Sequence, residues 1–172
     1  MKQKNQIRSR TAYFGVFTAL ALIFSYVETL IPINFGIPGA KLGLANLVIV
    51  IVLYKTNWKE ALLLSAVRIV LAGFIFGNMF SIVYSLAGGL LSLAVMTGIR
   101  KNKGFSVIGV SMAGGVSHNI GQLAVAVLVV QTYQVGYYLP VLLIAGLATG
   151  ALNGVISSGV LKSLRNVNFT DN

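Results

Sequence analysis

Residues 61–99 read ALLLSAVRIVLAGFIFGNMFSIVYSLAGGLLSLAVMTGI and decide the fold class, because these 39 residues contain a single charge, Arg68. A helix that crosses a bilayer needs about 20 mostly apolar residues, so this stretch is long enough for two. A charged side chain inside hydrocarbon costs several kcal/mol. We therefore expect Arg68 to face the interior of a bundle, where a partner residue or a ligand offsets that cost.

The composition of the whole chain extends this reading to all 172 residues, of which 56% are apolar and 9% are charged. Soluble domains carry about 25% charged residues. The chain is therefore predicted to be an all-α integral membrane protein with no separate soluble domain. It has no cysteine and one histidine, which excludes disulfides and leaves too few ligands for a typical zinc site. We expect no metal and no cofactor.

Six apolar stretches are candidate membrane spans, and together they predict a six-helix bundle. The second stretch is short enough to be a partial or tilted span, and the fifth is long enough to bend or unwind near Gly114 and Gly115. The predicted spans are residues 11–31, 42–54, 58–76, 80–99, 106–131 and 137–161. Residues 1–10 form a basic amino terminus, 11–161 a single transmembrane domain, and 162–172 a polar tail.

The basic residues predict the orientation, because lysine and arginine concentrate on the cytoplasmic side of a membrane protein. In the predicted topology eleven basic residues lie on one side and Lys41 lies alone on the other. Both termini are then cytoplasmic, and we expect the chain in the cell membrane. The eleven are Lys2, Lys4, Arg8, Arg10, Lys55, Lys59, Arg100, Lys101, Lys103, Lys162 and Arg165.

The few polar residues within the spans are the candidate site, because such residues usually face a bundle interior or a water-filled cavity. The loop 32–41 contains two prolines and two glycines and suits a structured cap on the outer side. Arg68 either pairs with Glu28 as a structural ion pair or anchors an anionic or carbonyl-bearing ligand. The candidate ligand-binding residues are Glu28, Lys41, Asn46, Arg68, Asn78, His118, Asn119 and Gln122.

His118 and Gln122 are four residues apart and share a helix face. Their cluster either joins helices through hydrogen bonds or lines a pocket. Small residues at four-residue spacing leave a similar choice between packing inside the bundle and docking a partner membrane protein. Gly146, Gly150 and Gly154 form one such ridge, and Thr11, Gly15 and Ala19 form another.

The chemistry that the sequence lacks argues against catalysis. There is no G-x-x-x-x-G-K-[ST] motif for nucleotide phosphates. The three acids are Glu28, Glu60 and Asp171, which lie in different parts of the chain and cannot form the carboxylate cluster that holds Mg²⁺ in diphosphate chemistry. We therefore expect a ligand-binding protein that is not itself an enzyme, and any ATP hydrolysis would come from partner subunits.

Four motifs in this order resemble the Gx transporter family, which is also labelled heptaprenyl diphosphate synthase component I. The resemblance runs from about residue 11 to about residue 161. The motifs are Lys41-Leu42-Gly43-Leu44-Ala45-Asn46, Arg68 with Phe76-Gly77, Ser85-Leu86-Ala87-Gly88-Gly89, and His118-Asn119-Ile120-Gly121-Gln122.

That family in turn looks like the S components of energy-coupling factor (ECF) transporters, which are six-helix membrane proteins that bind a micronutrient near the outer surface. The resemblance implies a capping loop at residues 32–41. It also implies docking through Thr11, Gly15 and Ala19 onto a coupling subunit with two ATPases, although the family's alanine-rich docking face is only partly present. It names no ligand. The alternative function is a membrane accessory protein of quinone or isoprenoid metabolism, or of a membrane redox assembly, in which Arg68 and His118 hold a quinone or prenyl ligand.

Overall fold

The computed structural model describes residues 2–31, 43–102, 104–131 and 133–166, and in these ranges all regular structure is helical. The predicted capping loop and Lys41 lie outside the described residues. One α-helix overlaps each predicted span, and a 3₁₀-helix, η1 (Tyr133–Tyr138), precedes the last α-helix. The helices are α1 (Lys2–Leu30), α2 (Asn46–Lys55), α3 (Trp58–Phe76), α4 (Met79–Arg100), α5 (Val107–Val130) and α6 (Leu139–Ser163).

Four of the described helices are long and apolar enough to cross a membrane: α1 from Arg10, α4, α5, and α6 together with the end of η1. This makes the chain a membrane protein. The helix α3 has the predicted bounds, but its three charged residues, Lys59, Glu60 and Arg68, set it apart from these four helices. The helix α2 has 10 residues and is about 15 Å long, half of a hydrocarbon core about 30 Å thick. The count of six spans therefore stays a prediction.

Two helices differ from the sequence prediction in a way that their residues explain. The helix α1 begins at Lys2 instead of near Thr11, because residues 2–10 contain no glycine or proline to interrupt it. The helix α5 is continuous through Gly114 and Gly115. Those two glycines do not unwind the helix. They let α4 and α6 approach it, since Met96 packs on Gly114 and the Gly146 backbone packs on Gly115.

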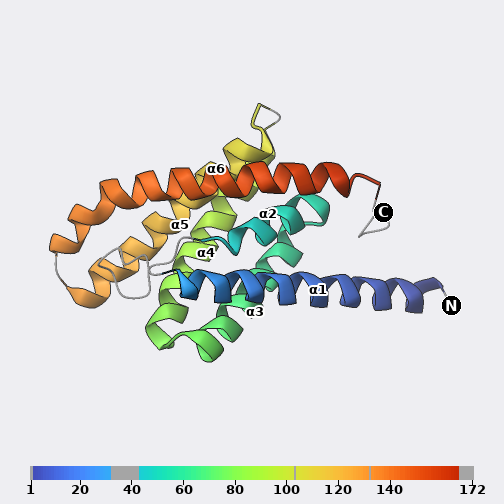
Figure 1. Cartoon of the computed structure of the whole chain (residues 1–172), viewed down its shortest axis with the longest axis horizontal. Helices are drawn as coiled ribbons and strands as arrows, with labels where there is room; N and C mark the ends of the chain where they lie inside the picture. Colours follow the sequence, from blue (N-terminus) through green and yellow to red (C-terminus); the bar gives the residue numbers. More distant parts are fainter. Residues whose placement is uncertain (1, 32–42, 103, 132, 167–172) are drawn as a thin grey trace.

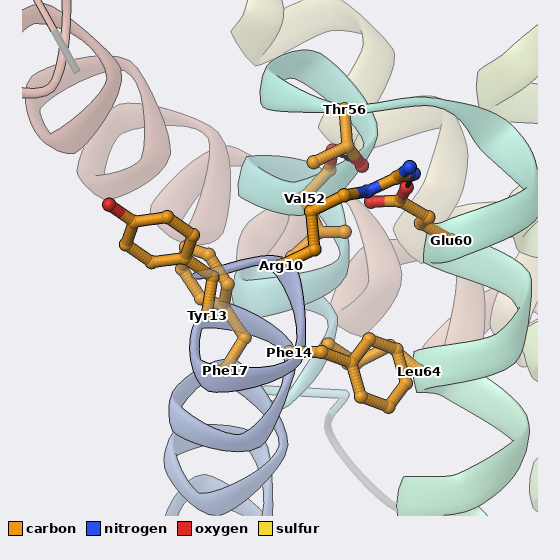
Figure 2. Close-up of a pocket in the computed structure, with 8 residues that line it drawn as sticks. All are labelled: Arg10, Tyr13, Phe14, Phe17, Val52, Thr56, Glu60 and Leu64. Atoms are coloured by element: carbon orange, nitrogen blue, oxygen red, sulfur yellow. Dashed lines mark hydrogen bonds and ion pairs between the residues drawn. The ribbon is translucent and has the colours of Figure 1, made fainter. Parts of the chain in front are cut away.

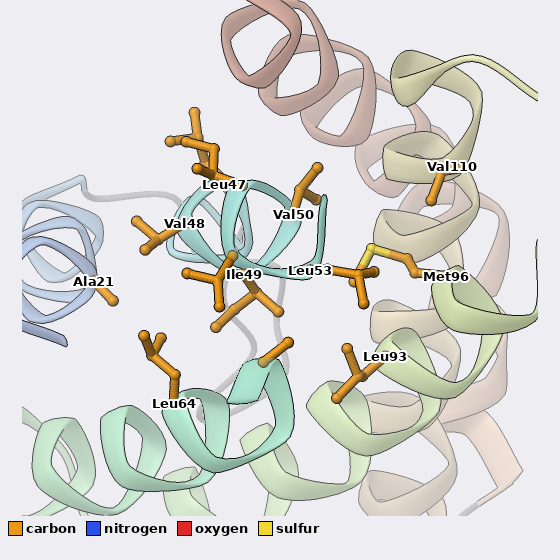
Figure 3. Packing of buried hydrophobic residues seen from close by; sticks show 13 residues of the cluster. Ala21, Leu47, Val48, Ile49, Val50, Leu53, Leu64, Leu93, Met96 and Val110 are labelled. Carbon is orange, nitrogen blue, oxygen red and sulfur yellow. The ribbon is translucent and has the colours of Figure 1, made fainter. Parts of the chain in front are cut away.

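The short helix α2 lies inside the bundle and forms its apolar core. Its residues from Asn46 to Leu53 are all buried, so no side of this helix faces the surroundings. Such a helix is apolar on every side, as the run Leu47–Leu53 is. Figure 3 shows its side chains pointing toward Ala21 of α1, Leu64 of α3, Leu93 and Met96 of α4, and Val110 of α5. Burial of α2 therefore holds the other helices together.

The first described residues of α1 and the last of α6 lie on the same side of the bundle (Figure 1). Three basic side chains join helices to one another. Arg10 pairs with Glu60, which joins α1 to α3. The guanidinium of Arg100 donates to the Leu53 carbonyl at the end of α2, and the ammonium of Lys55 donates to the Leu164 carbonyl after α6. The last carbonyls of a helix have no partner within it, and cations near that end are favourable.

The glycines of α6 pack against α5. A methyl group built on Gly150 would lie 2.7 Å from the Met112 Cα, and one on Gly154 would lie 2.7 Å from the Ile108 Cα. A methyl group built on Gly146 would lie 2.8 Å from the Gly115 carbonyl oxygen. Such contacts let the two backbones approach where lipid gives no hydrophobic drive for helices to associate. The small-residue ridge of α6 is therefore a packing surface within this bundle.

Gly150→Ala is expected to destabilise the protein by about 1–3 kcal/mol, because the added methyl group would overlap the α5 backbone. Thermal unfolding of the detergent-purified protein measures this. The matched control is Gly159→Ala on the same helix, where the methyl group meets nothing within 4 Å. It should be neutral or slightly stabilising, since alanine is the better helix former. Equal effects of the two changes would contradict the packing role.

Candidate functional site

Gly43 lies where three helices meet, just before α2. Its φ of +82° is a conformation that glycine adopts without strain. Its amide donates to the Glu28 carboxylate on α1, and the Leu44 amide lies 3.4 Å from the same oxygen. Its carbonyl accepts a hydrogen bond of 3.0 Å from the Asn153 side-chain amide on α6. A carboxylate at the amino end of a helix is favourable, because the first amides have no partner within the helix.

The His118 ring lies between Gly43 and Gly88, and so joins α5 to the start of α2 and to α4. A methyl group on Gly43 would be 3.8 Å from His118 Cδ2 and 3.1 Å from the Asn46 side-chain nitrogen. A methyl group on Gly88 would be 3.0 Å from His118 Cε1 and 2.9 Å from Gln122 Cγ. Both glycines leave room for the polar side chains of Asn46, His118 and Gln122.

Arg68 reaches this region from α3. The guanidinium is buried and donates to Ser25 Oγ at 3.3 Å, on α1 one turn before Glu28. Glu28 lies close enough to act on Arg68 through its charge. Within the described part of the chain, Arg68 donates to the hydroxyl group of Ser25 on α1, and the carboxylate of Glu28 accepts a hydrogen bond from the Gly43 amide.

Four buried polar atoms of this region have no hydrogen-bond partner, although their side chains are at most 5% exposed: the nitrogen and oxygen of the Gln122 amide, Nε of Arg68 and Oδ1 of Asn153. Leaving a buried polar group unsatisfied costs about 1–3 kcal/mol. We refer to Glu28, Gly43, Asn46, Arg68, His118, Gln122 and Asn153 as the Gly43 cluster. Its free donors and acceptors make it the candidate ligand site.

Two predicted site residues lie elsewhere. Asn78 is exposed and caps the amino end of α4, where its side chain accepts from the Ser81 amide at 2.8 Å. The Asn119 side chain donates to the Leu142 carbonyl at 2.7 Å and thereby joins α5 to α6. The structure gives both of them a helix-capping or helix-joining contact.

The sequence pattern indicated no ligand-binding role for Gly43, Ser25 or Asn153. Gly43 had a visible signal, because it stands in a polar motif just before a short apolar run. Ser25 is three residues before Glu28 and so shares its helix face. The bond from Asn153 had no such signal, because it joins residues 110 positions apart.

A second candidate is the cleft at the basic end of the bundle, between α1, α2 and α3 (Figure 2). The Arg10–Glu60 pair lies beside it, and the aromatic rings of Tyr13, Phe14 and Phe17 line it. Its cavity of about 20 Å³ has room for about one water molecule. As it stands, it is too small for a metabolite.

The two described acids are far apart and both are engaged. Glu60 pairs with Arg10, and Glu28 binds the amides before α2. Arg10 and Glu28 are 18 residues apart on α1, which places them about 27 Å apart at 1.5 Å per residue. Glu28 and Glu60 therefore cannot share a metal ion in this arrangement.

A family model described as heptaprenyl diphosphate synthase component I matches residues 17–160. The chain belongs to this family. The match spans every described helix except the first half of α1, before Phe17, and the last three residues of α6. No curated protein and no solved structure matched the chain. Its family name connects this membrane protein with isoprenoid metabolism.

Gly43→Ala in this family member is expected to cost about 1–2 kcal/mol of stability, because an alanine at φ +82° is strained. The new methyl group would also press on the Asn46 side chain. Thermal unfolding in detergent measures the loss. The control is Gly136→Ala in η1, where a methyl group meets nothing within 4 Å. A stability loss of the same size in the control would show that the Gly43 conformation is not needed.

Proposed function

We propose that the chain is the substrate-binding membrane subunit, or S component, of an ECF-type transporter, and that it captures a small micronutrient or metabolite from outside the cell. The observation that carries the proposal is the Gly43 cluster. Unpartnered donors and acceptors inside an apolar bundle are unfavourable until something binds them. A binding protein has a use for such groups, whereas a purely structural bundle does not.

The position of the cluster supports uptake from outside. The cluster lies at the amino end of α2, and the basic residues Lys55 and Arg100 lie at its carboxyl end. If the basic end is cytoplasmic, as the charge rule favours, the cluster lies in the outer half of a bacterial cytoplasmic membrane.

Energy would come from a coupling subunit and two ATPases, since the chain has no nucleotide-binding motif. The small residues Thr11, Gly15 and Ala19 are exposed on α1, and a methyl group on Gly15 would meet nothing within 4 Å. That face is open to a partner helix, in contrast to the glycine ridge of α6. On this proposal the chain itself is not an enzyme.

An accessory role in quinone or isoprenoid metabolism is the second candidate function, and the family name favours it. In this role the Gly43 cluster would bind a quinone carbonyl or a prenyl headgroup. Arg68 and Gln122 supply the hydrogen-bond donors that a carbonyl oxygen needs.

Affinity purification of the tagged chain from its native host separates the two functions. An S component should bring down an ATPase and a membrane coupling subunit, and mass spectrometry should find a water-soluble small molecule. A quinone or prenyl lipid in the extract would favour the accessory role. Repeated purification without ATPase subunits would reject the transport proposal.

Gln122→Met is expected to leave the thermal unfolding midpoint unchanged or slightly raised, because the Gln122 amide has no hydrogen-bond partner to lose. It should, however, abolish retention of the small molecule that co-purifies with the parent chain. The control is Asn119→Leu, which loses the bond to Leu142 and should destabilise the protein by about 1 kcal/mol. If Gln122→Met lowers stability and leaves retention intact, Gln122 belongs to the framework and not to the site.

A further inference from the structure

Resting on the proposed binding function, we propose that the ligand of the Gly43 cluster carries a carboxylate or an equivalent anionic group. This group replaces the Glu28 carboxylate on the amides of Gly43 and Leu44. Without ligand, the Glu28 carboxylate then occupies the position that the acidic group of the ligand takes.

The first observation is the half-length of α2. Because α2 has 10 residues, its amino end lies inside the bundle, beside Glu28 near the last turn of α1 and Asn153 in the middle of α6. The amides of a helix amino end attract anions, through both their hydrogen atoms and the helix dipole. In this structure the Glu28 carboxylate is the anion bound there.

The second observation is that the same region holds polar atoms that Glu28 does not satisfy. Arg68 is 5% exposed and its Nε has no partner, although the Glu28 charge acts on it. The Asn153 amide donates to the Gly43 carbonyl, while its Oδ1 has no partner. The Gln122 amide is unpartnered at both atoms.

The donors and acceptors of the cluster indicate the chemistry of the ligand. Arg68 Nε and the α2 amides are donors, and an anionic acceptor would satisfy both more fully than Glu28 does alone. Asn153 Oδ1 and the Gln122 oxygen are acceptors and call for an N–H or O–H group on the same molecule. The ligand class is therefore a small acid that also carries a hydrogen-bond donor.

The buried charges require that the ligand carboxylate replaces the Glu28 carboxylate and does not bind beside it. Arg68 and Glu28 are the buried charged side chains of the described residues, and they balance each other. A second carboxylate beside Glu28 would place two like charges on one arginine inside the bundle, which is strongly unfavourable. The ligand must therefore displace Glu28, and the occupancy of the amides by Glu28 lowers the apparent affinity for the ligand.

The test uses the full chain purified in detergent and a small-molecule extract of the native host. An anion exchanger divides the extract into an anionic and a non-anionic fraction. Each fraction is titrated while thermal unfolding is followed, and mass spectrometry identifies the retained molecule. We expect the anionic fraction to raise the unfolding midpoint of the unmodified chain, and the non-anionic fraction to leave it unchanged.

Glu28→Gln sharpens the test, because glutamine keeps an oxygen for the Gly43 amide but removes the competing charge. The amount of anionic extract that gives half-maximal stabilisation should then fall about tenfold or more relative to the unmodified chain. Such a fall is expected when a competing group no longer occupies the site. The control is Glu60→Gln, which removes the acid that pairs with Arg10 and should leave the titration unchanged. Should Glu28→Gln fail to fold, Glu28→Asp is used, since it keeps the charge but shortens the reach to the amides.

Each outcome decides a different claim. Stabilisation by the non-anionic fraction alone would overturn the carboxylate inference and leave the binding function standing. Stabilisation by neither fraction would reject the binding function itself. If the anionic fraction binds and Glu28→Gln weakens that binding, Glu28 contacts the ligand directly. The inference that Glu28 occupies the position of the ligand's acidic group is then wrong.

Discussion

The bond between the Glu28 carboxylate and the amides before α2 is the constraint on which the bundle depends. Inside a membrane, backbone groups must find partners within the protein, because no water is available to them. A helix that starts in the bundle interior exposes its first amides there. Glu28 satisfies the amide of Gly43 and approaches that of Leu44, so α2 can start inside the bundle. The turn that precedes the helix then needs glycine, because its φ is +82°.

Once α2 is held in this way, the remaining architecture follows from its composition. A helix that is apolar on every side is stable only when other helices surround it. Side chains of α1, α3, α4 and α5 cover it, and Ser157 of α6 donates to the Leu47 carbonyl. The polar residues of those helices are consequently brought to the two ends of α2. One end holds the Gly43 cluster, and the other holds Arg100, whose guanidinium also lies 5.0 Å from the Tyr54 ring centroid.

The sequence was sufficient to predict the helices, because long apolar runs bounded by charges or turn residues can be read one segment at a time. It also indicated that Arg68 would be buried. It could not show that Arg68 would donate to Ser25 while Glu28 bound the backbone, because that choice depends on how α1 is rotated about its axis. The two small-residue ridges make the same point. Gly15 and Gly150 stand in similar patterns, yet Gly15 is exposed and Gly150 packs against Met112. Only the relative placement of helices separates such cases.

The contacts of Lys55 and Arg100 also bear on how membrane topology is mapped. Both residues belong to the charge asymmetry from which orientation is read, and both donate to carbonyls near the ends of helices. A reporter fusion in which either is neutralised or reversed would therefore mix two effects, altered insertion and a loosened helix end. Lys101 and Lys162 are exposed and have no such contact among the described residues. Charge changes at these two lysines would report on insertion with less disturbance of the fold.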